Sequence, residues 1–174
     1  MDVLVLSDTH GARHAIERML GQINFKPSAV LFLGDGLRDL DFAEYEKTAK
    51  ADVFAVAGNC DVWRVGVDDA PEVRIEMIGG KRIVMMHGHT FGVKGGPGAA
   101  IRYAHSVDAD VLLFGHTHVP MEQTLPAGER VGDIVLTKPL LVANPGSLGQ
   151  GMERTFGVLT VQGDGVLFSH GRLV

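Results

Sequence analysis

The sequence predicts an α/β fold in which two mixed β-sheets pack face to face with helices on the outside. Two observations support this prediction. In the first third of the chain, short apolar runs alternate with amphipathic stretches, which is the pattern of a parallel sheet with right-handed crossovers. After residue 70, short strand-like runs separated by turn residues dominate, which predicts a second sheet.

The first sheet is predicted from three apolar runs and two helical patterns. Val3–Leu6 is compact and β-branched, as expected for a strand buried on both faces, and it is followed by similar runs at Val30–Leu33 and Val53–Val56. Between the first two runs, residues 12–22 carry an apolar stripe at helical spacing. A second helix is expected over residues 41–50.

The second sheet is predicted to begin with a hairpin. Val73–Ile78 and Arg82–Met86 flank a Gly79-Gly80 turn, and glycine pairs favour the tightest hairpin loops. A helix over Gly98–Ser106 and a strand at Val111–Phe114 follow. The remaining expected strands are 119–125, 134–136, 140–143, 156–161 and 166–170, with a turn at 163–165.

Length and composition limit the possible functions. The 174 residues, 45% hydrophobic and 21% charged, fit one globular domain over residues 1–174. The net charge of -5 is spread along the chain, which argues against a protein that grips long nucleic acid. A small phosphorylated substrate stays possible, because bound metal ions would bring positive charge. Cys60 is the only cysteine, so no internal disulfide can form.

The chain also lacks the sequence signs of export. No basic start precedes a long apolar stretch, and the longest apolar runs are far short of the roughly 20 residues of a membrane helix. We therefore expect no signal peptide, no membrane span and a cytoplasmic location. An exposed edge strand in the second sheet leaves a homo-oligomer open.

Five expected strands run directly into residues that can bind metal ions. In open α/β sheets, ligands bind at the carboxyl ends of the strands, so these segments should meet in space. Each segment alone could be a turn or a helix cap. Two aspartates, an asparagine and several histidines at successive strand ends instead predict a shared ligand. The segments are Asp8-Thr9-His10, Gly34-Asp35, Gly58-Asn59-Cys60-Asp61, His87-Gly88-His89 and Gly115-His116-Thr117-His118.

The donor types indicate which ions would bind. Carboxylate, amide and imidazole groups without thiolate suit divalent manganese, iron, cobalt, nickel or zinc. Seven donors are too many for one tetrahedral zinc ion, but they suit two ions about 3.5–4 Å apart that clamp a phosphate. A carboxylate is the natural bridge, because it has two oxygens and a charge that offsets both cations. Asp35, at the central strand end, is the expected bridging ligand.

With these motifs in this order, the sequence resembles the calcineurin-like metallophosphoesterase superfamily. The short length, Cys60 and the segment Asn144–Ser147 resemble its small bacterial and archaeal phosphodiesterase branch. The resemblance implies a four-layer α/β/β/α sandwich and a metal-dependent phosphodiesterase, in which a metal-bridging hydroxide attacks a small phosphodiester in line. Manganese is the expected ion, with nickel, iron, zinc, cobalt and magnesium open. The implied ligands are Asp8, His10, Asp35 and His118 for one ion, and Asp35, Asn59, His87 and His116 for the other.

Four features leave alternatives open. Many members of the superfamily have a histidine where this chain has Cys60, and a thiol with a pKa of about 8.5 is a poorer general acid near neutral pH. His89 is expected to be catalytic, alongside Asp35 and Asn59, as a substrate contact or proton donor, with a loop role as the alternative. Asp61 either orients a neighbouring group or forms a turn, and Asn144 is expected to hold a ligand histidine in one tautomer. A non-catalytic scaffold, as in the retromer subunit of the same fold, is the alternative function, and the complete ligand set favours the enzyme.

Overall fold

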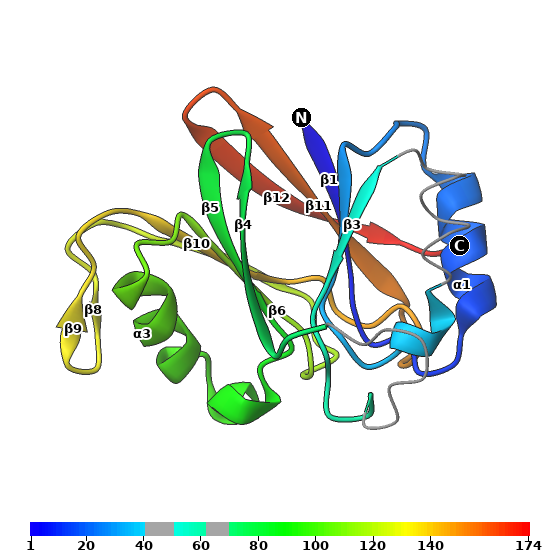
Figure 1. The fold of residues 1–174 in the computed structure, drawn as a ribbon, viewed down its shortest axis with the longest axis horizontal. Helices are drawn as coiled ribbons and strands as arrows, with labels where there is room; N and C mark the ends of the chain where they lie inside the picture. Colours follow the sequence, from blue (N-terminus) through cyan, green and yellow to red (C-terminus); the bar gives the residue numbers. More distant parts are fainter. Residues whose placement is uncertain (41–50, 62–69) are drawn as a thin grey trace.

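The first sheet combines three parallel strands with an antiparallel pair from the end of the chain. The computed structural model describes residues 1–40, 51–61 and 70–174 (Figure 1). Within them, β1 (Asp2–Leu6), β2 (Ala29–Phe32) and β3 (Asp52–Ala55) are parallel. β11 (Thr155–Gln162) pairs antiparallel with β1, and β12 (Gly165–Arg172) pairs with β11. The strand order is β12-β11-β1-β2-β3.

The second sheet has the order β4-β5-β6-β10-β7. Its parallel centre consists of β5 (Lys81–Met86), β6 (Val111–Phe114) and β10 (Leu140–Asn144). The edge strands β4 (Val73–Ile78) and β7 (Met121–Leu125) are antiparallel to their neighbours. The β4–β5 turn places Gly79 at φ 59° and Gly80 at φ 79°, the left-handed conformations that a two-residue hairpin loop requires.

Three apolar layers hold the elements together. Between the sheets, Val5, Leu31, Met85 and Leu113 belong to one buried cluster. The helix α1 (Arg13–Gln22) packs on the outer face of the first sheet, and α3 (Gly98–Ser106) packs on the outer face of the second. Figure 1 shows the two helices on opposite outer sides of the sheets. The predicted four-layer α/β/β/α sandwich is therefore confirmed.

The structure differs from the sequence prediction at a few elements. The expected strand 119–125 begins only at Met121, because Pro120 has no N–H to give to a ladder. The expected strand at 134–136 is not part of the second sheet; β9 (Ile134–Val135) pairs with β8 (Arg130–Val131) in a separate two-stranded sheet. The expected helix over 41–50 lies outside the described residues. No helix in the described ranges is long and apolar enough to cross a membrane.

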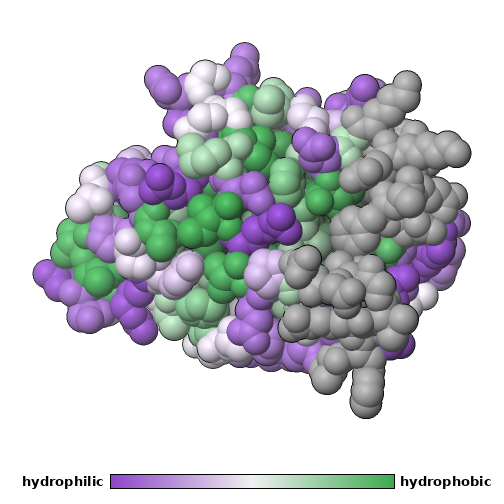
Figure 2. All heavy atoms as spheres, viewed as in Figure 1, coloured by the Kyte–Doolittle hydropathy of each residue, from purple (hydrophilic) through white to green (hydrophobic). Residues whose placement is uncertain are grey.

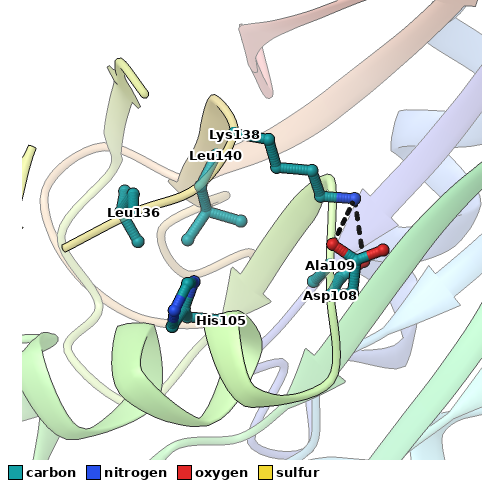
Figure 3. Close-up of a pocket in the computed structure, with 6 residues that line it drawn as sticks. All are labelled: His105, Asp108, Ala109, Leu136, Lys138 and Leu140. Atoms are coloured by element: carbon teal, nitrogen blue, oxygen red, sulfur yellow. Dashed lines mark hydrogen bonds and ion pairs between the residues drawn. The ribbon is translucent and has the colours of Figure 1, made fainter. Parts of the chain in front are cut away.

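Short 3-10 turns and a small pocket complete the fold. The turns are η1 (Leu37–Asp39), η2 (His89–Phe91) and η3 (Val93–Gly95), all of which follow carboxyl ends of strands. The pocket lies at the opposite, amino end of β6, under α3 (Figure 3). Its lining residues are His105, Asp108, Ala109, Leu136, Lys138 and Leu140.

Candidate metal centre

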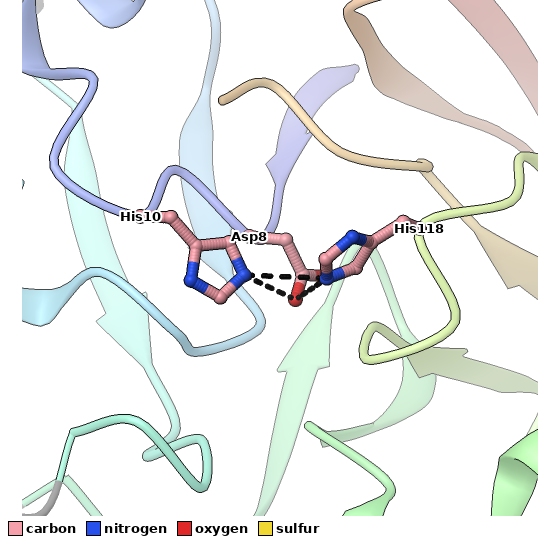
Figure 4. A group of neighbouring side chains, drawn as sticks. All are labelled: Asp8, His10 and His118. Atoms are coloured by element: carbon pink, nitrogen blue, oxygen red, sulfur yellow. Dashed lines mark hydrogen bonds and ion pairs between the residues drawn. The ribbon is translucent and has the colours of Figure 1, made fainter. Parts of the chain in front are cut away.

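The loops after β1 and β6 bring one group of metal-competent side chains together. The Asp8 Oδ1 atom lies 3.1 Å from His118 Nε2 and 3.6 Å from His10 Nε2. The two histidine Nε2 atoms are 3.2 Å apart. Figure 4 shows both rings turned toward the Asp8 carboxylate. Residues separated by more than 100 positions in the chain thus present three donor atoms to one point.

A second group lies beside the first and uses the loops after β2, β3, β5 and β6. The His87 Nε2 atom is 3.4 Å from Asp35 Oδ2, 3.1 Å from His116 Nδ1 and 3.2 Å from Asn59 Oδ1. His87 and Asp35 are buried, whereas His116 is half-buried. The seven predicted metal ligands therefore fall into two adjacent groups.

Asp35 is the residue that the two groups share. Its Oδ2 atom lies 3.4 Å from His87 Nε2 in the second group and 3.8 Å from His10 Nε2 in the first. Its other oxygen accepts a hydrogen bond of 2.7 Å from the backbone N–H of Cys60. The position between the groups is the one that a bridging carboxylate would need.

The acidic and imidazole groups change one another's pKa. Burial alone would raise the pKa of Asp35, but the His87 ring and the Cys60 N–H hold it well below its usual value. Burial likewise lowers the pKa of His87, yet the Asp35 hydrogen bond and the Asp8 charge raise it overall. The pKa of His116 is lowered by burial and by its neighbour His87. The Asp35 carboxylate therefore stays ionised, which makes the site attractive to cations.

Two details of the geometry fit divalent metal ions. Asp8 Oδ1 is buried and accepts no hydrogen bond in the described structure, although buried polar oxygens normally do. Two pairs of ring nitrogens face each other at 3.1 Å and 3.2 Å. Ligands bound at about 2.1 Å to one ion at right angles would be separated by about 3.0 Å. The donor set is thus arranged as ligands are around a metal ion.

The backbone around these donors is unusual. Six non-glycine residues in the described ranges have positive φ, and five of them are the aspartates and histidines discussed above. Left-handed conformations cost a non-glycine residue energy and persist only where the surroundings hold them. The five are Asp8 (54°), His10 (45°), Asp35 (57°), His116 (65°) and His118 (59°).

Asp61 holds the second group in place. One oxygen of its buried carboxylate accepts backbone N–H bonds from Asp35 (2.7 Å) and Gly58 (2.8 Å). The other accepts bonds from Gly36 (2.9 Å) and Leu37 (3.0 Å). This one side chain ties the Asp35 turn to the loop that carries Asn59, and it also closes the 58–61 turn through Gly58, so both roles left open by the sequence are observed.

Asn144 stabilises the histidine loop in a different way from the one predicted. Its Nδ2 donates to the Gly115 carbonyl (2.8 Å) and to Thr117 Oγ1 (3.1 Å), and it touches no ligand histidine ring. The prediction of a tautomer-fixing contact is therefore wrong, because β10 runs parallel to β6 and places Asn144 beside the loop backbone. The ring of His87 is oriented instead by the Leu33 carbonyl, 2.8 Å from its Nδ1.

Comparison with known proteins agrees with this geometry. The model of the calcineurin-like phosphoesterase superfamily domain matches residues 1–164. The chain belongs to this superfamily. It is 30% identical to the phosphodiesterase YfcE of Escherichia coli over 86% of both chains. The predicted family membership is confirmed.

Two solved structures share the superfamily fold with this chain. A conserved protein of Streptococcus pneumoniae, described as a predicted phosphoesterase, superimposes with a TM-score of 0.73 at 25% identity, over 97% of this chain and 87% of that one. Vacuolar protein sorting 29 of Cryptosporidium parvum superimposes with a TM-score of 0.69 at 22% identity, over 98% and 97%. The second likeness concerns the fold alone.

Two further residues line this site of the superfamily fold. Cys60 is an exposed residue whose sulfur lies near the donor atoms of His10 and Asp35. Partial desolvation of the thiol, together with the hydrogen bond to Asp35 and the Asp35 charge, raises the pKa of Cys60 to about 11. His89 lies at the start of η2, with its ring centre 5.4 Å from that of His87 and 6.1 Å from that of His116. Its Nδ1 atom is buried and has no hydrogen-bond partner in the described structure. His89 thus lies next to the second group without belonging to it.

Proposed function

We propose that this protein is a phosphodiesterase that uses two divalent metal ions to hydrolyse small phosphodiesters. The position of Asp35 carries the proposal, because its Oδ2 atom lies between the two donor groups. A site for one ion would need no shared carboxylate. The likeness to the phosphodiesterase of Escherichia coli supports the choice of a diester, and the net charge of -5 favours a small substrate over long nucleic acid.

The proposed ligands follow the two groups. Asp8, His10, Asp35 and His118 would hold one ion, and Asp35, Asn59, His87 and His116 the other. Manganese is the ion that we propose first, and these oxygen and nitrogen donors also accept nickel, iron, zinc, cobalt or magnesium. When bound, the two ions supply positive charge for the phosphate and lower the pKa of water, so that hydroxide is available near neutral pH.

The protein side chains have separate roles in this proposal. Asp35 would offset the charge of both cations. The Asn59 amide presents its oxygen to the second group, and its nitrogen donates to the Cys60 sulfur, 3.3 Å away. His89 would donate a hydrogen bond or a proton to the substrate, because its half-buried ring lies beside the second group. The Cys60 thiol lies near His10 and Asp35 and would contact the substrate.

The second candidate is a non-catalytic scaffold, which the fold-level likeness to vacuolar protein sorting 29 raises. A scaffold would need neither the left-handed backbone at five donor residues nor the shared carboxylate. These features favour the enzyme, and a direct assay separates the two functions.

The test uses metal-stripped protein and two chromogenic substrates, bis-p-nitrophenyl phosphate as diester and p-nitrophenyl phosphate as monoester. Mn²⁺, Ni²⁺ or Mg²⁺ is added back, and metal binding is measured in parallel by calorimetry. We expect two ions per chain and metal-restored cleavage that prefers the diester. Two bound ions without turnover of either substrate would support the scaffold. A single bound ion would refute the shared-carboxylate assignment.

A further inference from the structure

The second sheet ends in a strand whose outer edge has no partner among the described residues. β4 pairs with β5 only, in a hairpin whose loop is Gly79-Gly80. In a two-residue hairpin the pair that flanks the loop, here Ile78 and Lys81, is hydrogen-bonded, and bonded pairs alternate along the strand. The N–H and C=O groups of Val73, Ile75 and Met77 therefore point away from β5, toward the free edge.

The side chains of β4 give this edge two different faces. On the outer face, Ile75 and Met77 are 41% and 60% exposed, large fractions for apolar side chains. Figure 2 shows hydrophobic side chains on this side of the molecule, over β4 and the elements beside it. On the other face, Arg74 and Glu76 form an ion pair of 2.6 Å, and the guanidinium of Arg74 lies 5.3 Å above the Phe54 ring. An edge without proline, and without lysine on its exposed face, is open to strand addition.

The order of these side chains makes the edge complementary to itself. We propose that β4 pairs antiparallel with β4 of a second copy of this chain, about a twofold axis at Ile75. In that register Val73 faces the partner's Met77, and Ile75 faces the partner's Ile75. Arg74 faces the partner's Glu76, so two opposite-charge pairs form across the axis.

Backbone geometry agrees with the same register. The outward-pointing groups belong to the odd-numbered residues of β4, and the proposed register pairs odd-numbered residues with one another. Each such pair can exchange two hydrogen bonds, whereas Arg74 and the partner's Glu76 would form a non-bonded pair, in which side chains approach most closely. A shift by one residue would set outward groups against inward ones and would place apolar side chains on opposite faces.

A second copy fits this edge better than an unrelated strand. Any extended segment could bond to the backbone groups of this edge. A second β4 strand in antiparallel orientation also places apolar side chains opposite apolar ones and Arg74 opposite Glu76. The pairing buries less than the about 1,600 Å² of a standard interface, so we expect a weak dimer with a dissociation constant of about 10–100 μM.

Sedimentation velocity of the full chain between about 5 and 500 μM tests the proposal. We expect the wild-type protein to shift from monomer to dimer over this range. Ile75→Lys should stay monomeric at every concentration, because it sets two like charges against each other across the axis. Leu167→Lys is the matched control: Leu167 is also exposed, at 62%, and lies on the edge strand β12 of the other sheet. It should dimerise like the wild type.

Exchanging the charges of Arg74 and Glu76 distinguishes a variant that cannot dimerise from one that does not fold. Arg74→Glu and Glu76→Arg should each weaken the dimer by about tenfold or more, since each sets like charges opposite one another. An equimolar mixture of the two variants should associate again, and the double variant R74E/E76R should dimerise alone. Wild-type protein that stays monomeric at the highest concentration would overturn the proposal. So would a dimer that survives Ile75→Lys, or variants that fail to associate when mixed.

Hydrogen exchange locates the interface independently. At high concentration the amides of Ile75 and Met77 should become protected, whereas the amides of Arg74 and Glu76, which face β5, should be protected at every concentration. Concentration-dependent protection on β7 or β12 without any on β4 would assign the dimer to another edge and refute this one.

Discussion

The two ends of β6 carry two charged clusters of opposite character. At its amino end, the Lys138 ammonium lies 3.2 Å from Asp108 (Figure 3) and 3.0 Å from Asp110. Asp110 also accepts the Arg82 N–H at 2.8 Å, and the Arg82 guanidinium lies 3.9 Å from Asp108. At its carboxyl end, Asp8 and Asp35 face imidazole rings and no lysine or arginine in the described structure. The first cluster is neutralised by the protein itself, whereas the second has its negative charge left over for a cation.

The backbone shows the same difference. Asp108, the sixth non-glycine residue with positive φ (55°), follows α3, and the helix end explains it: the Ala109 N–H bonds back to the Ala104 carbonyl, as in a Schellman cap. The five left-handed residues at the other end follow no helix. Four of them, Asp8, His10, Asp35 and His116, donate their backbone N–H to groups distant in sequence. Local sequence therefore accounts for one strained position, and the site accounts for the others.

The largest expected effect is that of Asp35→Asn. Removing the shared charge should lower phosphodiester turnover by about 100-fold or more and should weaken binding of both ions. Turnover and calorimetric titration with Mn²⁺ measure the two effects. Asp110→Asn, at the neutralised end of β6, is the matched control and should leave both unchanged. Full activity of Asp35→Asn would exclude a bridging role.

Removing the metal ions should lower the free energy of unfolding, and only through the metal centre at the carboxyl end of β6. An ion present at 100 times its dissociation constant stabilises the folded state by about 2.7 kcal/mol, which for a chain of this size raises Tm by about 5–10 °C. Calorimetric scans of stripped protein with and without Mn²⁺ measure the shift. The shift should persist in Asp110→Asn and shrink in Asp35→Asn. Equal shifts in the two variants would place the ions elsewhere.

The comparison also explains how much the sequence could predict. Strand ends followed by Asp, Asn and His predicted the set of metal-competent side chains, because parallel strands end at one edge and residue types alone identify such side chains. Their division into two ligand groups was implied by the resemblance to the superfamily. The orientation of His87 by the Leu33 carbonyl could not be predicted, since every residue has such a carbonyl. The partners of Asn144 depend on the register of β10 against β6, which the apolar pattern does not fix.

Asp61 is an intermediate case that sharpens the comparison further. The sequence shows Asp61 two positions after Asn59, but it does not show which backbone groups bind the carboxylate. Three of the four come from a loop more than 20 residues away, at 35–37, and the fourth, Gly58, comes from its own turn. Asp61→Asn replaces one oxygen by an N–H₂ group that faces two donors. We expect a loss of about 1–3 kcal/mol in the free energy of unfolding.

We also expect metal binding of Asp61→Asn to be weaker by about 10–100-fold, because the Asp35 turn loses its support. Urea unfolding and Mn²⁺ titration measure the two losses. Asp39 gives a comparison at the first group, where its carboxylate accepts bonds from Thr9 and the Gly11 N–H. Asp39→Asn should destabilise the fold while affecting the second ion less. Unchanged metal affinity in Asp61→Asn would reduce Asp61 to a purely structural role.

The smallest effect is expected at the neutralised end. Burial raises the pKa of Asp110, but the Arg82 N–H and the Lys138 ammonium outweigh it and lower the pKa overall. A carboxyl with a lowered folded-state pKa contributes stability above its unfolded pKa of about 3.9 and loses it as the pH falls through the folded value. Asp110→Asn should therefore cost about 1 kcal/mol at pH 7, and the difference from wild type should shrink below about pH 4.

Urea unfolding of metal-free protein at several pH values checks this expectation. Asp133→Asn is the control, because the Asp133 side chain is 84% exposed and its 3.8 Å pair with Arg102 is screened by solvent, so the cost should be near zero at every pH. A cost for Asp110→Asn that stayed constant through acid would show that the carboxylate charge is irrelevant. In that case the ion pairs at the amino end of β6 would add nothing to stability. The two ends of β6 would then differ in packing, and the contrast in how their negative charge is neutralised would not hold.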